Sequence, residues 1–224
     1  MGGACSTVKP SEPTDVNLWP SDKHAKEYLE RADSIPHRRE GEATLLELLP
    51  KQIGRFLDIG AGGGRLLNLV KGVHPSAQCV ALDFSPTMLK ILRDDFGKDP
   101  GVTILEHDLA YPLPALGLFD VIVSSFAIHH LSHERKRSLY GESYSLLERG
   151  GAFLNLEHVA SPSLALHNEF LKAIGVTPDA EDPSNKLLDF GIQMDWLREL
   201  GFADVDCHWK WRELASLAGS KPRH

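Results

Sequence analysis

Residues 56–65 read Phe-Leu-Asp-Ile-Gly-Ala-Gly-Gly-Gly-Arg, an apolar segment that runs into an acidic, glycine-rich turn. Glycine at Gly60, Gly62 and Gly64 lets the chain turn sharply and lets bare backbone approach a ligand, which a Cβ at those positions would obstruct. Residues 66–70 continue with helical character, so the first N–H groups of a helix face the turn. The pattern therefore predicts a strand, a turn and a helix that together hold a nucleotide-like ligand.

The spacing of the glycines separates two classes of cofactor. The dinucleotide fingerprint G-x-G-x-x-G would place a glycine at position 65, where this chain has Arg65. The pattern present, an acid at Asp58 followed by glycines at alternate positions from Gly60, resembles the first motif of the class I S-adenosylmethionine-dependent methyltransferases. This resemblance implies that Asp58 lies beside the methionine moiety of S-adenosylmethionine. A glycine turn with a purely structural role is the alternative.

A second apolar segment, residues 78–83, ends in Asp83 at roughly the twenty-residue separation expected for a carboxylate that binds a ribose. A carboxylate offers two acceptor oxygens to two hydroxyl donors. Because Ser85 suits the N-cap of the following helix, Asp83 is free for a ligand. Phe84 can lie against the adenine face, and Met88 can add an apolar contact.

Later segments extend the resemblance along the chain. An acid after the third methyltransferase strand accepts a hydrogen bond from the adenine amino group, and Asp108 matches it. Residues 119–131 resemble the fourth motif, whose buried strand ends against the methionine portion of the cofactor. The cofactor-binding residues expected on this basis are Asp58, Gly60, Gly62, Asp83, Phe84, Met88, Asp108, Leu109, Ser124 and, from the N-terminal helices, Tyr28.

The order of the predicted elements indicates an α/β fold. Strands are expected near residues 55–59, 78–83, 102–106, 119–124 and 151–157, with helices near 64–72, 86–96 and 132–148 between them. Such alternation predicts a parallel, doubly wound sheet. Two further strands, about 203–210 and 213–218, would complete a mostly parallel seven-stranded sheet as an antiparallel pair. The resemblance implies a Rossmann-like methyltransferase fold with an N-terminal helical cap.

The chain divides into three expected parts. Residues 1–21 are rich in Pro, Ser and Thr and predict a flexible leader. Residues 22–50 predict a helical cap, and residues 51–224 a methyltransferase domain with a lid insertion at about 161–188. The first residues also fit an N-myristoylation pattern at Gly2 with Cys5 nearby, but so short a pattern recurs by chance, and a leader without lipid is the preferred interpretation.

The composition of the chain limits which other classes of protein it can belong to. With 224 residues, 42% of them hydrophobic, the chain can bury the core of one α/β domain. It has no run of about 18 apolar residues and no secretory signal, so we expect a cytoplasmic protein without a membrane partner. A net charge of -7 argues against nucleic acid. Three cysteines without paired spacing predict neither a disulfide nor a metal site. The oligomeric state is left open.

Candidate catalytic residues follow the fourth and fifth strands, because ligands of doubly wound sheets bind at the carboxyl ends of the strands. Methyl transfer requires alignment of the acceptor and, for a hydroxyl or ammonium group, removal of a proton. His129 and Glu157 are the catalytic candidates. A structural hydrogen bond at the strand end is the alternative role for His129. A divalent metal on His129, Glu157 and His158 is disfavoured, since no local spacing supports it.

Four residues are expected to bind the acceptor: Arg38, His130, His158 and Trp196. Arginine and aromatic side chains suit a planar or carboxylated molecule, although a tryptophan can equally belong to the core.

The sequence thus predicts a methyltransferase that uses S-adenosylmethionine, releases S-adenosylhomocysteine and methylates O or N of a small-molecule acceptor. A protein or RNA methyltransferase and a catalytically silent cofactor-binding module are the alternatives. Arg65 weighs against a nicotinamide oxidoreductase.

Overall fold

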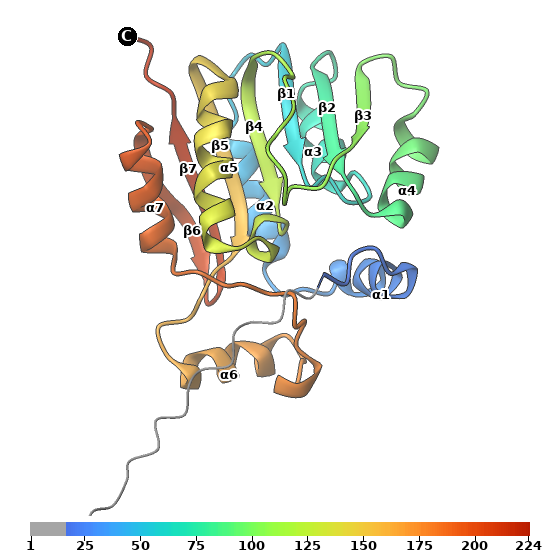
Figure 1. The fold of residues 1–224 in the computed structure, drawn as a ribbon, viewed down its shortest axis with the longest axis vertical. Coiled ribbons are helices and arrows are strands. Elements are labelled where there is room, and N and C mark those ends of the chain that lie inside the picture. The colour runs from blue at the N-terminus through green and yellow to red at the C-terminus, as the bar shows by residue number, and fades with distance from the viewer. Residues whose placement is uncertain (1–16) are drawn as a thin grey trace, which may run out of the picture.

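The computed structural model describes residues 17–224 (Figure 1). Residues 1–16, which carry the Gly2 pattern and most of the expected leader, lie outside the described residues.

A seven-stranded sheet forms the centre of the molecule, with the strand order β3-β2-β1-β4-β5-β7-β6. Strands β1 to β5 run parallel to one another, and β7 runs antiparallel between β5 and β6. The mostly parallel, doubly wound fold predicted from the sequence is confirmed. The strands are β1 (Arg55–Ile59), β2 (Gln78–Asp83), β3 (Val102–Glu106), β4 (Phe119–Ser125), β5 (Leu147–His158), β6 (Ala203–Trp211) and β7 (Leu214–Ser220).

The central strands are apolar on both faces, as parallel strands covered on both sides must be. Successive residues alternate between two separate cores, with Phe56 in one and Leu57 in the other. The first core is completed by apolar residues of α2, α3 and α4, and the second by residues of α5 and α7. The helices are α1 (Asp22–Ala32), α2 (Arg38–Glu47), α3 (Arg65–Val73), α4 (Pro86–Phe96), α5 (His133–Leu146), α6 (Leu164–Ala173) and α7 (Phe190–Glu199), with short 3₁₀ turns η1 (Ile128–His130) and η2 (Pro178–Ala180).

The two N-terminal helices have different roles. Helix α2 packs on the sheet, where Leu45 is fully buried and a Cβ on Gly41 would meet Leu156 at 2.7 Å. Helix α1 lies beyond the carboxyl ends of the parallel strands, on the same side of the sheet as α6 (Figure 1). The segments around α1 and α6 therefore cover the edge at which doubly wound folds bind ligands. Among residues 17–224, no helix has the length and apolar character that crossing a bilayer would require.

Candidate active site

A main cavity of about 970 Å³ lies at the carboxyl ends of β1, β2 and β4. Its wall is formed by the loops after these strands, by Trp19 and by Tyr28 of α1. Of the expected cofactor residues, those that line it are Tyr28, Asp58, Gly60, Gly62, Asp83, Phe84, Met88, Asp108 and Leu109. Ser124 does not line it, because its side chain is fully buried and its hydroxyl donates to the Ile59 carbonyl at 2.8 Å.

The glycines of the turn serve two different purposes. Gly62 has φ +56°, its N–H donates to Asp83 Oδ2 at 2.8 Å, and no atom lies within 4 Å of the position a Cβ would take. Gly64 has φ +86°, and a Cβ there would meet Phe96 at 2.5 Å and Leu92 at 2.9 Å. Gly62 therefore leaves room on the cavity side, whereas Gly64 allows α3 to approach α4.

Asp58 provides a test of whether the cavity fits S-adenosylmethionine. Its side chain is 1% exposed, lines the cavity, and has no hydrogen-bond partner for either carboxylate oxygen among the described residues. Burial and the neighbouring Asp83 raise the pKa of Asp58 to about 7, against the weaker influence of the Leu67 backbone N–H. A buried carboxylate without a partner is costly. A cationic ammonium, such as that of the methionine moiety, would offset this cost, so the donor set fits the cofactor.

Asp83 lies at the end of β2 with both oxygens facing backbone donors. Oδ1 accepts from the Ser85 N–H at 2.8 Å, while Oδ2 accepts from Gly62. Burial raises the pKa of Asp83, and these backbone N–H groups oppose the rise. Each carboxylate oxygen has a second lone pair, so the fixed side chain can still accept from two ribose hydroxyls. The side chain of Phe84, which follows Asp83, also lines the cavity.

An ionic network ties the N-terminal helices to the glycine turn. Arg65 hydrogen-bonds Glu42 of α2 and Asp33, which follows α1. Arg38, only 4% exposed, donates to Glu42 at 2.8 Å and to the Tyr28 hydroxyl at 3.2 Å. Burial alone would raise the pKa of Glu42, but the two arginines outweigh it and lower the pKa. Arg38, expected to bind the acceptor, lies in this network at the wall of the main cavity.

A small cavity of about 150 Å³ adjoins the main one and shares Trp19, Tyr28, Phe126 and His130 with it. The side chains of His129 and His158 line this small cavity as well. The expected acceptor residues are thus divided in space. His130 and His158 line the small cavity, whereas Trp196 on α7 packs into the core beneath α5 and lines neither cavity.

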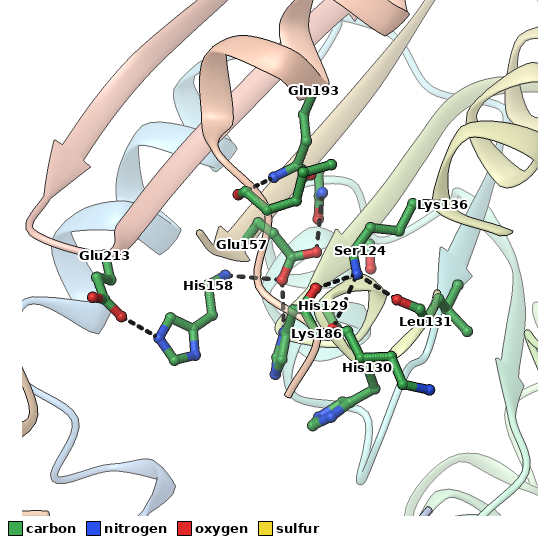
Figure 2. Close-up of polar contacts among 12 residues, drawn as sticks. Ser124, His129, His130, Leu131, Lys136, Glu157, His158, Lys186, Gln193 and Glu213 are labelled. Carbon is green, nitrogen blue, oxygen red and sulfur yellow. Dashed lines mark hydrogen bonds and ion pairs between the residues drawn. The ribbon is translucent and has the colours of Figure 1, made fainter. Parts of the chain in front are cut away.

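His129 and Glu157 form a buried pair (Figure 2). His129 Nδ1 lies 2.7 Å from Glu157 Oε1, and Glu157, which is fully buried behind the histidine, also accepts from the His158 backbone N–H at 2.8 Å. Burial lowers the pKa of His129 well below its ordinary 6.5, and His158 and Lys136 add to this effect. Burial raises the pKa of Glu157. The Glu157 contact assigns the proton to Nδ1 and leaves a lone pair on Nε2.

Lys136 of α5 supports the turn that carries His129, and the sequence analysis did not single it out. Its side chain is fully buried, and Nζ donates to the carbonyls of His129, Leu131 and Lys186 (Figure 2). Burial lowers its pKa to about 8. The ammonium of Lys136 therefore links two backbone segments, the turn that carries His129 and the segment after η2. Its position one helical turn before Leu139 and Tyr140, on the buried face of α5, is the signal that predicts its burial.

Trp19 is a second residue that sequence reasoning missed. It precedes α1, lines both cavities and contacts His130 edge-to-face at 5.3 Å between ring centroids. No local pattern marks it. Within residues 17–224, no group of three or more His, Cys, Asp or Glu side chains is arranged to hold a metal ion.

Comparisons with known proteins agree with this geometry. The family described as "Methyltransferase domain" matches residues 56–151. The chain is 35% identical over 127 residues to a demethylmenaquinone methyltransferase of Thermus thermophilus, a match that covers 56% of this chain and 55% of that protein. The chain spans about half the length of the curated relatives it matches.

Solved structures show the same fold. An O-methyltransferase family protein from Burkholderia thailandensis superposes with a TM-score of 0.70 at 18% identity, over 91% of this chain and 61% of that one. Human N-acetylserotonin methyltransferase in complex with S-adenosylmethionine superposes with a TM-score of 0.66 at 16% identity, over 92% of this chain and 58% of that one. Residues 56–151 thus match the methyltransferase domain, and the chain has the fold of these solved methyltransferases, which supports S-adenosylmethionine as the cofactor.

Proposed function

We propose that this protein transfers a methyl group from S-adenosylmethionine to O or N of a small molecule bound in the small cavity. The observation that carries the proposal is the junction of the two cavities. The main cavity has the acids and the glycine turn that suit the cofactor, and the small cavity places a Glu-bound histidine beside it. When bound, S-adenosylmethionine supplies an electrophilic methyl group on a sulfonium sulfur.

The residues of the chain would hold the cofactor at three points. Asp58 suits the ammonium of the methionine moiety, Asp83 the ribose hydroxyls, and Asp108 the adenine amino group, with Phe84 and Met88 against the ring. Asp108 Oδ1 already accepts from the Ala110 N–H at 2.9 Å, which fixes the carboxylate at the cavity wall.

His129 would act as the general base. Its Nδ1–H donates to Glu157, so that Nε2 is free to accept the proton of an acceptor O–H or N–H. Glu157 holds the ring in one tautomer and stabilises the imidazolium that forms. The Nδ1 atom of His130 lies 2.9 Å from the Ser184 hydroxyl, and its ring is tilted against that of His129 with 4.0 Å between the centroids. His130 would therefore shape the passage between the cavities.

A small acceptor is supported by the size and lining of the small cavity and by the relatives. The Thermus relative is a demethylmenaquinone methyltransferase, and the human structure is of an N-acetylserotonin methyltransferase. A protein or RNA acceptor would need a more open surface than a cavity of about 150 Å³.

Titration calorimetry with S-adenosylmethionine and S-adenosylhomocysteine tests the cofactor site. We expect binding by the parent protein and a loss of about 1.5–3 kcal/mol in Asp83→Ala, the range for hydrogen bonds to charged groups. Release of S-adenosylhomocysteine in the presence of hydroxylated or aminated small molecules tests transfer. Equal affinity of Asp83→Ala and the parent would refute the ribose assignment, and cofactor binding without transfer to any acceptor would favour a silent binding module.

A further inference from the structure

A second histidine in the small cavity is held in the same manner as His129. The His158 ring lies with its centroid 5.4 Å from that of His129, and its Nε2 is 2.9 Å from Oε2 of the buried Glu213 (Figure 2). Glu213 comes from the turn between β6 and β7, whereas Glu157 belongs to β5. The mechanism proposed above uses only the first pair.

The surroundings of Glu213 fix which nitrogen of His158 carries the proton. Glu213 Oε1 is 2.9 Å from His167 Nδ1, and His167 Nε2 is 3.1 Å from Glu181. Burial would lower the pKa of His167, but the two carboxylates outweigh it and raise the pKa. Burial would raise the pKa of Glu213, but hydrogen bonds from His158, Ser161 and His167 lower it. An ionised Glu213 accepts only, so His158 Nε2 carries a hydrogen, and in the neutral ring the lone pair is then on Nδ1.

The small cavity therefore adjoins two imidazole lone pairs, one from His129 and one from His158. One part of its wall is apolar and is formed by Phe126, Phe170, Leu171, Ile174, Val176 and Leu214, and the other part is polar and includes His24, Arg31, Ser34, Glu181, Asp182 and Asn185. The volume of about 150 Å³ accommodates one benzene ring against the apolar part of the wall. A ring with a single hydroxyl satisfies one lone pair and leaves the other buried without a donor, which is unfavourable.

We propose, on the basis of the proposed function, that the acceptor is a single aromatic ring bearing two hydroxyl groups, and that His158 is the residue that selects it. One hydroxyl faces His129, loses its proton and is methylated. The second donates to Nδ1 of His158, keeps its proton and orients the ring. His158 thus determines specificity without contacting the transferred methyl group.

The test is a calorimetric titration of the S-adenosylhomocysteine-loaded protein with each of four ligands: catechol, resorcinol, hydroquinone and phenol. We expect at least one dihydroxybenzene to bind about 10- to 100-fold more tightly than phenol, as expected for one satisfied hydrogen bond in a buried site. His158→Phe, which keeps the ring and removes both nitrogens, should reduce this preference to less than about 3-fold while phenol affinity changes little. His208→Phe, the same change at an exposed position on β6, should retain the full preference.

Two results would overturn the inference: a parent protein that binds phenol as tightly as all three dihydroxybenzenes, or a His158→Phe variant that retains the preference. The parent comparison decides the question even if His158→Phe does not fold. The titration needs no turnover. If the parent protein prefers a dihydroxybenzene to phenol but transfers no methyl group, the proposed function would be overturned while the two-histidine binding site would stand.

Discussion

At the scale of single residues, the candidate site contains titratable groups whose protonation is set mainly by burial. Within residues 17–224, Asp58 has no side-chain hydrogen-bond partner and its pKa is raised, whereas His129 is held neutral by burial and oriented by Glu157. Burying either of these titratable side chains costs folding free energy unless a ligand or a reaction uses it. This cost is the physical reason for assigning the two residues to function rather than to stability.

His129→Ala should lower turnover by roughly 10²- to 10⁴-fold, the usual contribution of a positioned base, and should spare cofactor affinity. Steady-state kinetics and calorimetry with S-adenosylhomocysteine would separate the two effects. Unchanged turnover would assign His129 a structural role at the end of β4. A large loss of cofactor affinity would place it in the cofactor shell instead.

The pH dependence of the parent follows from the same residue. A base is active only when unprotonated, and the pKa of His129 is lowered well below 6.5, so the active form persists into acidic solution. We expect the acid limb of the kcat profile to lie below pH 6.5 rather than in the ordinary histidine range. A limb centred at or above that pH would show that the titrating group is not the buried His129.

At the scale of elements, the turn between β1 and α3 combines ligand access with helix packing. Gly64→Ala should destabilise the fold by more than the roughly 1–2 kcal/mol of left-handed strain, because its Cβ would also clash with Phe96 and Leu92. Gly62→Ala should lose only the stability that corresponds to the left-handed strain. It should also bind the cofactor more weakly, since its Cβ would stand at the cavity wall. Urea unfolding and calorimetry of both variants measure the contrast. Equal destabilisation by the two changes would contradict it.

Lys136 connects η1 with the segment after η2 through three backbone carbonyls. Lys136→Met keeps the length of the side chain but removes every donor, so we expect a loss of about 1–3 kcal/mol in the free energy of unfolding. Turnover should also fall, because His129 lies on the turn that the ammonium holds. Lys90→Met is the matched control, since Lys90 is exposed and an exposed ion pair such as that with Asp94 contributes little to stability. A Lys136 variant as stable as the control would refute the role.

At the scale of the whole molecule, the cavities lie between a rigid sheet and a weakly anchored cover. Only Ala25 and Ala32 of α1 are buried, and η2 buries no residue. Few buried apolar contacts imply low local stability. Yet Trp19 and Tyr28, which belong to the N-terminal part of this cover, line both cavities. A bound ligand would therefore add contacts to a segment that otherwise has few.

Hydrogen exchange with and without S-adenosylhomocysteine measures this coupling. We expect slower exchange of amides in residues 22–40 and 176–186 when the ligand is present, and little change in the central strands. Arg65→Ala, which removes the link between the glycine turn and the N-terminal helices, should weaken the protection of residues 22–40. Equal exchange in both states would eliminate the lid interpretation and leave the fold unaffected.

The sequence by itself determined the sheet, the glycine turn and the strand ends at which the candidate site lies. These features are local, because a short continuous apolar run, a glycine at positive φ and a strand terminus are each encoded within about ten residues. The bounds predicted for β1, β2 and β3 match the structure for this reason. The expected cofactor acids Asp58, Asp83 and Asp108 line one cavity because consecutive parallel strands end at one edge.

Only the tertiary structure decided which side chains meet across the small cavity. Glu213 reaches His158 from 55 residues away, through the antiparallel pairing of β5 with β7. Trp196, which is half-buried, packs against the second core instead of lining the small cavity. Such pairings depend on strand register and helix rotation, which are set by packing over the whole sheet. The motif for the cofactor class is therefore encoded locally, while the small cavity proposed for the acceptor forms only once the fold is complete.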